Sequence, residues 1–199
     1  MTRALSFLSS LFLLAVVAGC AGAGARPAPA AARPASPADV HFMSGMIPHH
    51  AQAVLIAGWA PTHGANPAVR VLSERIVVGQ RDEIALMQGW LRDHGQPVPD
   101  ADATHMTMSM AGMQHEMLMP GMLNDEELAQ LDAARGPAFD RLFLTFMIGH
   151  HQGAIMMVDE LFASNDAAND NTVFKMASDV WADQNIEIER MRALLAAQP

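Results

Sequence analysis

The sequence of 199 residues predicts an all-α fold, a four-helix bundle made of two duplicated helical hairpins. A histidine pair in the pattern Phe-x3-Met-Ile-x-His-His occurs twice, within residues 42–53 and 143–154. A run of the form Gln-x2-Glu-Ile-x2-Met follows each pair, within residues 80–91 and 184–195. Apolar residues around these motifs recur every three or four positions, which is helical spacing, and no segment predicts a strand. Each half is therefore expected to hold one helix with the histidine pair and one with the Gln-x2-Glu run.

Local signals place the two helices of the first half. Asp39 can cap the first helix, which is expected to end before Pro61. The second helix is expected to start at Asn66-Pro67, because proline fits the first helical position, and to stop at Gly95.

The second half has the same plan after a short extra segment. A helical segment opens at residue 124 and is broken by Gly136-Pro137, and a long helix then extends to about Phe162. An Asn-rich turn separates it from the last helix, expected over about 172–196.

The N-terminus has the form of an export signal. Residues 1–19 contain a short basic start, an apolar run and small residues, as in a lipoprotein signal peptide, and Cys20 would carry the lipid. An ordinary signal peptide with a chance cysteine is the alternative. Residues 20–38, rich in Pro and Ala, predict an extended tether, and the folded domain is expected over residues 39–199.

Composition excludes several classes of protein. Twelve Lys and Arg against 21 Asp and Glu give a net charge of −9, which argues against nucleic-acid binding. A single Cys excludes a disulfide framework and a cysteine-based zinc site. The excess of 16 Met and nine His is the feature that a function must explain.

Polar side chains interrupt each apolar helix face near its middle. If these faces point to one axis, His49, His150, Glu83 and Glu187 converge inside the bundle. Buried carboxylates must be paired or must bind a metal. Two solutions remain open: hydrogen-bonded His–Glu pairs, completed by the two Gln of the Gln-x2-Glu runs, or a divalent metal between imidazoles and carboxylates.

The second histidine of each pair lies about 100° further around the helix. His50 falls in line with Met43 and Met46, and His151 lies within one turn of Met147. Thioether and imidazole on adjacent turns suit soft and borderline ions such as Cu(I) or Ag(I). Simple core packing by these methionines is the alternative.

The segment between the halves, residues 100–123, is rich in Met. Its Met-x-Met spacing does not make a helical stripe, and flexible thioethers at this density can wrap a soft ion. The alternative is an apolar loop over the bundle, and Met119 and Met122 are assigned to packing. The candidate ligands of this second, more mobile site are His105, Met106, Met108, Met110, Met113, His115 and Met117.

Four stretches carry a family resemblance: FMSGMIPHHAQA, ERIVVGQRDEIALMQGWL, MPGML and FDRLFLTFMIGHHQGAIMM. Over residues 39–195 the sequence resembles the domain-of-unknown-function 305 family, ferritin-like four-helix proteins of the bacterial envelope. The resemblance implies this fold and, as in some members, copper binding through Met and His in metal tolerance. Other members often carry Met-Ala where this sequence has Met156-Met157, which leaves its ligand set open.

The sequence thus predicts an exported copper-binding protein of the cell envelope, anchored by lipid at Cys20 on the periplasmic side of the outer membrane. It would sequester or transfer Cu(I), preferred, or Cu(II), without catalysis; no protein partner is predicted. The ligands would be Met43, Met46, Met147, His50 and His151. His49 and His150 either join them as ligands or belong to the network with Glu83 and Glu187. The alternatives are an envelope scaffold without metal, and a metal-dependent oxidoreductase of ferritin-like type that uses His49, His150, Glu83 and Glu187.

Overall fold

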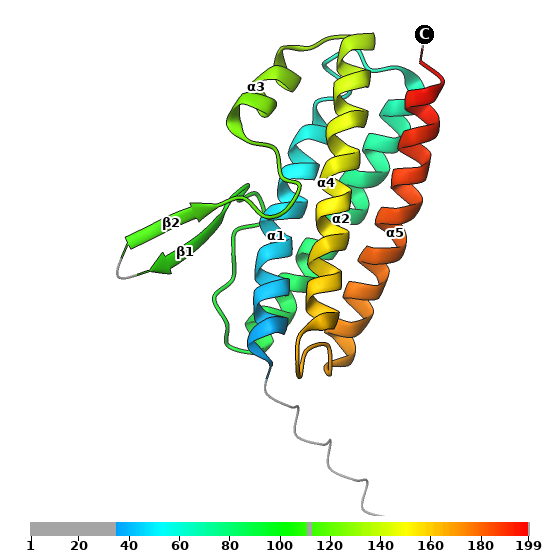
Figure 1. Cartoon of the computed structure of the whole chain (residues 1–199). Coiled ribbons are helices and arrows are strands. Elements are labelled where there is room, and N and C mark those ends of the chain that lie inside the picture. The colour runs from blue at the N-terminus through cyan, green and yellow to red at the C-terminus, as the bar shows by residue number, and fades with distance from the viewer. Residues whose placement is uncertain (1–34, 111–112, 199) are drawn as a thin grey trace, which may run out of the picture. The chain divides into compact units, whose positions relative to one another are not determined.

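The computed structural model describes residues 35–110 and 113–198. The predicted signal peptide, Cys20 and nearly all of the predicted tether lie outside the described residues. Within them the chain forms five helices and two short strands: α1 (Pro37–Gly58), α2 (Pro67–Asp93), β1 (Met106–Met110), β2 (Met113–Met117), α3 (Asp125–Ala133), α4 (Pro137–Ala163) and α5 (Asn171–Ala196). The four long helices confirm the predicted bundle (Figure 1).

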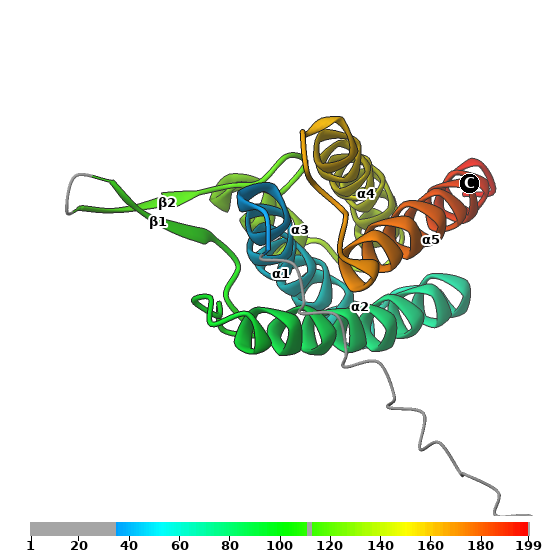
Figure 2. The same cartoon turned by 90° about the horizontal axis from the view of Figure 1, so that it is seen from below.

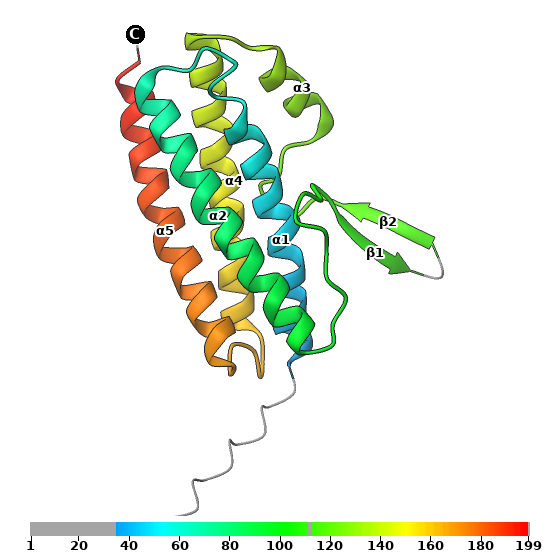
Figure 3. The same cartoon turned by 180° about the vertical axis from the view of Figure 1, so that it is seen from behind.

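The long helices pack as two hairpins. Helix α1 packs along α2 and α4 along α5, and further contacts join α1 to α4 and α2 to α5. Helices α1 and α4 run in opposite directions, as Figures 1 and 3 show from two sides. This arrangement makes the halves equivalent, so the midpoints of α1 and α4, where the histidine pairs lie, come to the same level. No helix in the described ranges is both long and apolar enough to cross a membrane.

Helix ends follow the capping rules, with one change from the prediction. Asn66 caps α2 through its side-chain oxygen, which accepts from the backbone N–H groups of Ala68 and Val69 at 2.9 and 3.0 Å. Asp39 is not the cap of α1: the cap is Ser36, and Asp39 completes a capping box with it at 3.0 and 3.3 Å. Helix α1 therefore begins at Pro37.

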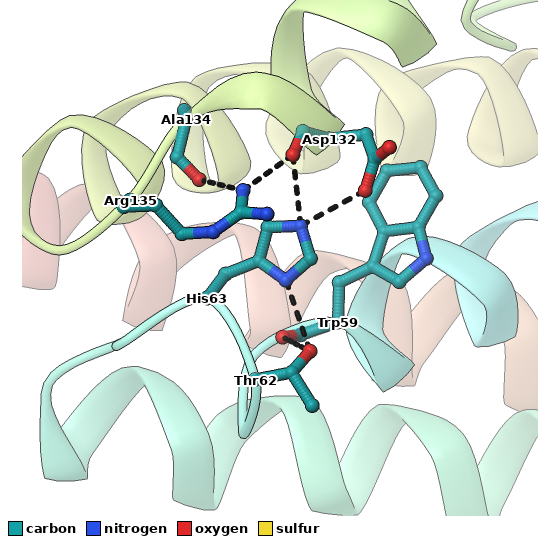
Figure 4. Close-up of polar contacts among 6 residues, drawn as sticks. All are labelled: Trp59, Thr62, His63, Asp132, Ala134 and Arg135. Atoms are coloured by element: carbon teal, nitrogen blue, oxygen red, sulfur yellow. Dashed lines mark hydrogen bonds and ion pairs between the residues drawn. The ribbon is translucent and has the colours of Figure 1, made fainter.

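One further histidine fastens α3 to the end of the bundle (Figure 4). His63 follows α1, is only 5% exposed, and contacts Asp132 through Nε2, 3.0 Å from both the backbone oxygen and Oδ1. Its Nδ1 lies 3.0 Å from the hydroxyl of Thr62, and its ring stacks on Trp59. Both ring nitrogens are satisfied, so His63 is a structural histidine.

The Met-rich segment is where the sequence prediction was wrong about secondary structure. Strands β1 and β2 pair antiparallel and project from the side of the bundle (Figures 1 and 2). No strand was predicted, yet a Met at every second position is the period of a strand, in which alternate residues share one face. The Met-x-Met spacing that argued against a helix was therefore a positive strand signal.

After the hairpin, residues 119–123 cross the helices as a strap. Met119 and Met122 are buried, as predicted for packing residues. Gln52 on α1 holds the strap by two hydrogen bonds to the backbone of Leu123, at 2.9 and 2.7 Å. On α4 the strap lies against Gly153, where a Cβ atom would stand 1.8 Å from the carbonyl oxygen of Pro120.

Candidate metal centre

A layer of polar side chains crosses the middle of the bundle. Nε2 of His50 lies 2.7 Å from Oε2 of Glu83, which joins α1 to α2. Nε2 of His151 lies 2.7 Å from Oε2 of Glu187, which joins α4 to α5 in the equivalent way. Two His–Glu pairs were one of the two predicted solutions, but their partners were assigned wrongly.

The corrected pairing follows from how α1 is covered. The prediction put His49 and His150 with the glutamates on the assumption that one helix face meets the core. Residues 45–53 of α1 are all buried, because α2, α4 and the strap cover different sides of the helix. Successive residues point about 100° apart, so His50 faces α2 while His49 faces α4. Both histidines of a pair are interior, with different neighbours.

His49 and His150 contact each other across the α1–α4 interface. Their ring centroids are 3.9 Å apart and both side chains are essentially unexposed. Nε2 of His49 also lies 3.0 Å from the carbonyl oxygen of Pro120 in the strap. A carbonyl only accepts hydrogen bonds, so Nε2 carries the proton and donates it.

This anchoring leaves bare nitrogens inside the protein. For His49, His50 and His151 the Nε2–H group donates to an oxygen, so Nδ1 bears a lone pair. These three Nδ1 atoms and both ring nitrogens of His150 are buried without a hydrogen-bond partner in the described part of the chain. An imidazole whose N–H is held by a carboxylate or a carbonyl, with the other nitrogen free, is the usual state of a metal ligand.

Burial favours the neutral form of His49, His150 and His151. It lowers the pKa of His49 to about 3, with a further lowering by the charge of His50. Burial, followed by the charge of His49, takes the pKa of His150 well below its ordinary value. Burial also lowers the pKa of His151, although its hydrogen bond to Glu187 opposes the shift. Neutral imidazole is the form that binds metal, so little proton release is required near pH 7.

The three helical methionines of the predicted site are fully buried. Met46 lies one turn before His49 and His50, Met147 holds the equivalent place on α4, and Met43 lies one turn further back. Within the described residues, 35–110 and 113–198, no three His, Cys, Asp or Glu side chains lie close enough together to hold a metal ion. The layer supplies donors, but its imidazoles must turn before several of them can reach one ion.

The hairpin brings the other candidate positions together. Its register pairs Met106 with Met117, Met108 with His115 and Met110 with Met113. Paired positions and alternate positions share a face of a two-stranded sheet, so these six positions fall on one face of the hairpin. His105 precedes β1, and its Nδ1 lies 3.3 Å from the hydroxyl of Thr104.

The two glutamines of the Gln-x2-Glu runs do not complete the network as one prediction had it. Gln80 and Gln184 are each 3% exposed, yet neither bonds a histidine or a glutamate of the layer. Beside them, burial and the charges of Glu83 and Glu187 raise the pKa of Asp183. Asp183 was not among the predicted site residues, although its place next to Gln184 on α5 was a usable signal.

Several solved structures are similar to this chain. A DUF305 fragment from Deinococcus radiodurans is 29% identical, with a TM-score of 0.67, over 82% of this chain and 99% of the other. A DUF305 protein from Streptomyces coelicolor, proposed to be secreted, is 28% identical, with a TM-score of 0.67, over 81% and 93% of the two chains. CopM in its Cu(II)-bound form is 28% identical, with a TM-score of 0.61, over 79% and 95% of the two chains. CopM has also been crystallised in Cu(I)-bound, silver-bound and apo forms.

Sequence comparison agrees with the structural one. A curated relative, the uncharacterised protein L153 of Acanthamoeba polyphaga mimivirus, is 32% identical over 53 residues, and this chain spans only 35% of its length. The family model described as "Domain of unknown function (DUF305)" matches residues 39–195. The chain therefore belongs to the DUF305 family, as its motifs predicted.

Proposed function

We propose that this protein binds copper, Cu(I) in preference to Cu(II), and sequesters or transfers it in the cell envelope. The observation that carries the proposal is the contact of His49 with His150, in a buried layer of imidazole nitrogens that lack partners. Each buried polar group left unsatisfied costs about 1–3 kcal/mol. A bound ion would recover that free energy, whereas a core built only for packing would not need these groups.

The chemistry of the donors favours copper. Neutral imidazole and thioether are borderline and soft ligands, which select Cu(I) over hard cations. CopM, a relative at 27% identity, was crystallised with Cu(I) and also with silver, a soft ion of the same charge. In this chain Met46 and Met147, each one turn from a histidine pair, are the sulfur donors closest in sequence to the imidazoles.

Two sites divide the task in this proposal. The Met-rich hairpin face, defined by Met106, Met108, Met110, Met113, His115 and Met117, would capture the ion first. The histidine layer would retain it more tightly, because its donors are held by Glu83, Glu187 and Pro120. The rings of His49 and His150 are in contact, so one ring would turn to admit the ion, and loading of this layer would be slower than capture.

The proposal also covers location. The signal-like residues 1–19 and Cys20 support export and a lipid anchor at the outer membrane, and a secreted state has been proposed for the Streptomyces coelicolor relative. Mass spectrometry of the mature protein from a membrane fraction tests the anchor. A lipidated N-terminal Cys20 is expected, and a soluble Cys20→Ser variant would agree with it. Unmodified protein in the soluble fraction would contradict the anchor.

An anaerobic competition titration with a Cu(I) chelator tests the binding itself. The double variant His49→Ala/His150→Ala should lose at least tenfold in affinity for the first equivalent. His63→Ala is the matched control, because His63 is a buried histidine with both nitrogens satisfied outside the layer. The control should lose stability but keep the copper affinity of the wild type. Equal affinities in wild type and double variant would contradict a helical copper site.

The same titration separates the alternatives. If the protein binds Cu(I) no tighter than an unfolded Met-rich peptide does, a scaffold function replaces the proposal. If the purified protein contains iron or manganese and turns over oxygen, a ferritin-like oxidoreductase replaces it.

A further inference from the structure

A hollow of about 200 Å³ lies between α2 and α5, and the copper proposal uses only its two glutamates, as partners of His50 and His151. Its lining includes Gln80 and Glu83 from α2 and, at the equivalent places of the repeat, Gln184 and Glu187 from α5. Asp183 also lines it. The duplication therefore brings both Gln-x2-Glu runs to one place, with oxygen-bearing side chains on both walls.

The two glutamines are the unusual part of this lining. Each is 3% exposed, and the amide oxygens of both, like the amide nitrogen of Gln80, lack a hydrogen-bond partner in the described part of the chain. An unsatisfied buried amide destabilises the folded state, and Met or Leu of similar size would pack without that cost. Two such groups at equivalent positions, both lining the same hollow, indicate a ligand for their oxygens.

The carboxylates point to the charge of that ligand. Glu83 and Glu187 each use Oε2 for a histidine, and their side chains keep 17% exposure. With Asp183 they bring three acidic groups to the hollow, whereas Arg75 is the one basic side chain among the described residues that line it. The lining thus has an excess of negative charge.

We infer that this hollow binds a hard divalent cation, with Ca²⁺ as the best fit. Ca²⁺ takes six to eight oxygen ligands from carboxylates, Gln or Asn carbonyls and water in flexible geometry, whereas Mg²⁺ demands a strict octahedron. The described residues that line the hollow include no Met or Cys, which disfavours Cu(I). Among the described residues no three His, Cys, Asp or Glu side chains are grouped closely enough to hold a metal ion by themselves, so the two carboxylates need the amide oxygens as further ligands. The direct ligands are Glu83, Glu187, Gln80 and Gln184, with water between the ion and Asp183.

The histidine layer has a second role in this site. His50 and His151 donate to Oε2 of the two glutamates and so hold these carboxylates in place. Hydrogen bonds of this kind to a ligand commonly change metal affinity by 10- to 100-fold. The cation site shares Glu83 and Glu187 with the copper proposal, in which they only orient histidines, whereas Gln80 and Gln184 belong to the cation site alone.

Isothermal titration of the copper-free protein with CaCl₂ tests the site. We expect saturable binding of one Ca²⁺ and a thermal unfolding midpoint that rises with Ca²⁺ concentration. The variant Gln80→Met/Gln184→Met should fold at least as stably as the wild type, because it removes unsatisfied amides, and should bind Ca²⁺ at least tenfold more weakly. Its Cu(I) affinity should stay within threefold of the wild-type value, which separates the two sites.

Glu189→Gln is the matched control for charge. Glu189 lies on the same helix, is exposed, and contacts Arg192 outside the hollow. Asp183→Asn should weaken Ca²⁺ binding about threefold more than Glu189→Gln does. No Ca²⁺ binding at millimolar concentration, or unchanged binding in the double glutamine variant, would overturn the site. Equal affinity for Mg²⁺ would overturn the choice of Ca²⁺.

Discussion

The histidine layer and the Met-rich hairpin carry the same two donor types in opposite surroundings. The layer is buried, and three of its four imidazoles are anchored through Nε2. The hairpin stands away from the bundle on two strands of five residues each, and Met117 at its base is 44% exposed. Donors anchored by hydrogen bonds favour retention of a metal ion, whereas the flexible thioether of methionine favours rapid exchange. This difference in surroundings is the reason why the proposed function assigns capture to the hairpin and retention to the layer.

The largest effect is expected where the strap meets the layer. In Gly153→Ala the new Cβ would stand 1.8 Å from the carbonyl oxygen of Pro120, and the strap would have to move. The expected loss is about 3 kcal/mol of unfolding free energy, measured by urea denaturation, together with weaker copper retention. Gly149→Ala, one turn away on α4, has nothing within 4 Å of its Cβ and should gain about 0.5–1 kcal/mol from helix propensity. Similar stabilities of the two variants would show that the strap does not pack here.

The second-largest effect is expected from removing the charges of Glu83 and Glu187, the carboxylates that contact His50 and His151. Glu83→Gln/Glu187→Gln keeps the shape of both side chains but removes the charge that orients His50 and His151. We expect Cu(I) affinity to fall by about 10- to 100-fold in competition titrations. Hairpin capture should be unaffected. If the copper affinity of this double variant matches that of Glu189→Gln, then His50 and His151 do not depend on their carboxylates for metal binding.

Acid should destabilise the histidine layer. The pKa of His49 is about 3 in the folded protein and about 6.5 in the unfolded chain, so between these values only the unfolded state takes up the proton. Stability therefore falls as the pH drops below about 6.5, by about 1.4 kcal/mol per pH unit for each such histidine. His49→Gln should reduce that slope, as measured by urea midpoints between pH 7.5 and 5. Parallel slopes for variant and wild type would contradict a neutral, buried His49.

The smallest effects are expected on the hairpin. Met108→Leu/Met110→Leu keeps apolar side chains on the strand but removes two thioethers, so stopped-flow loading with Cu(I) should slow about threefold while final affinity is unchanged. Thr107→Val/Ser109→Val is the control, because these positions alternate with the methionines and fall on the other face. Equal loading rates in both variants would remove the capture role from the hairpin.

Much of the bundle could be predicted from the sequence. The repeat of Phe-x3-Met-Ile-x-His-His and of Gln-x2-Glu gave the two hairpins, and Asn66 and Gly95 marked real helix ends. These features are local, because caps and helical periodicity act within a few residues. Even so, Asp39 was misplaced by local reasoning, since Ser36 completes the same capping box three residues earlier.

The details of the centre depended on packing that spacing does not encode. A helix covered on several sides has no single inner face, so the sequence could not assign Glu83 to His50 instead of His49. Nor could it show that a carbonyl at Pro120, 71 positions from His49, fixes the tautomer of that ring. The two strands, in contrast, could have been predicted from the sequence. The alternation of Met from Met106 to Met110 was visible, but it was used only to exclude a helix and not to predict a strand.

X-ray absorption at the copper K-edge, on protein loaded with one equivalent of Cu(I), tests the central claim most directly. We expect both imidazole nitrogen and sulfur around the copper, at about 2.0 Å and about 2.3 Å if the bonds are as long as those of zinc to nitrogen and sulfur. In His49→Ala/His150→Ala the nitrogen shell should diminish and sulfur should dominate. A spectrum of sulfur alone in the wild type would place the tight site on the hairpin and contradict storage in the histidine layer.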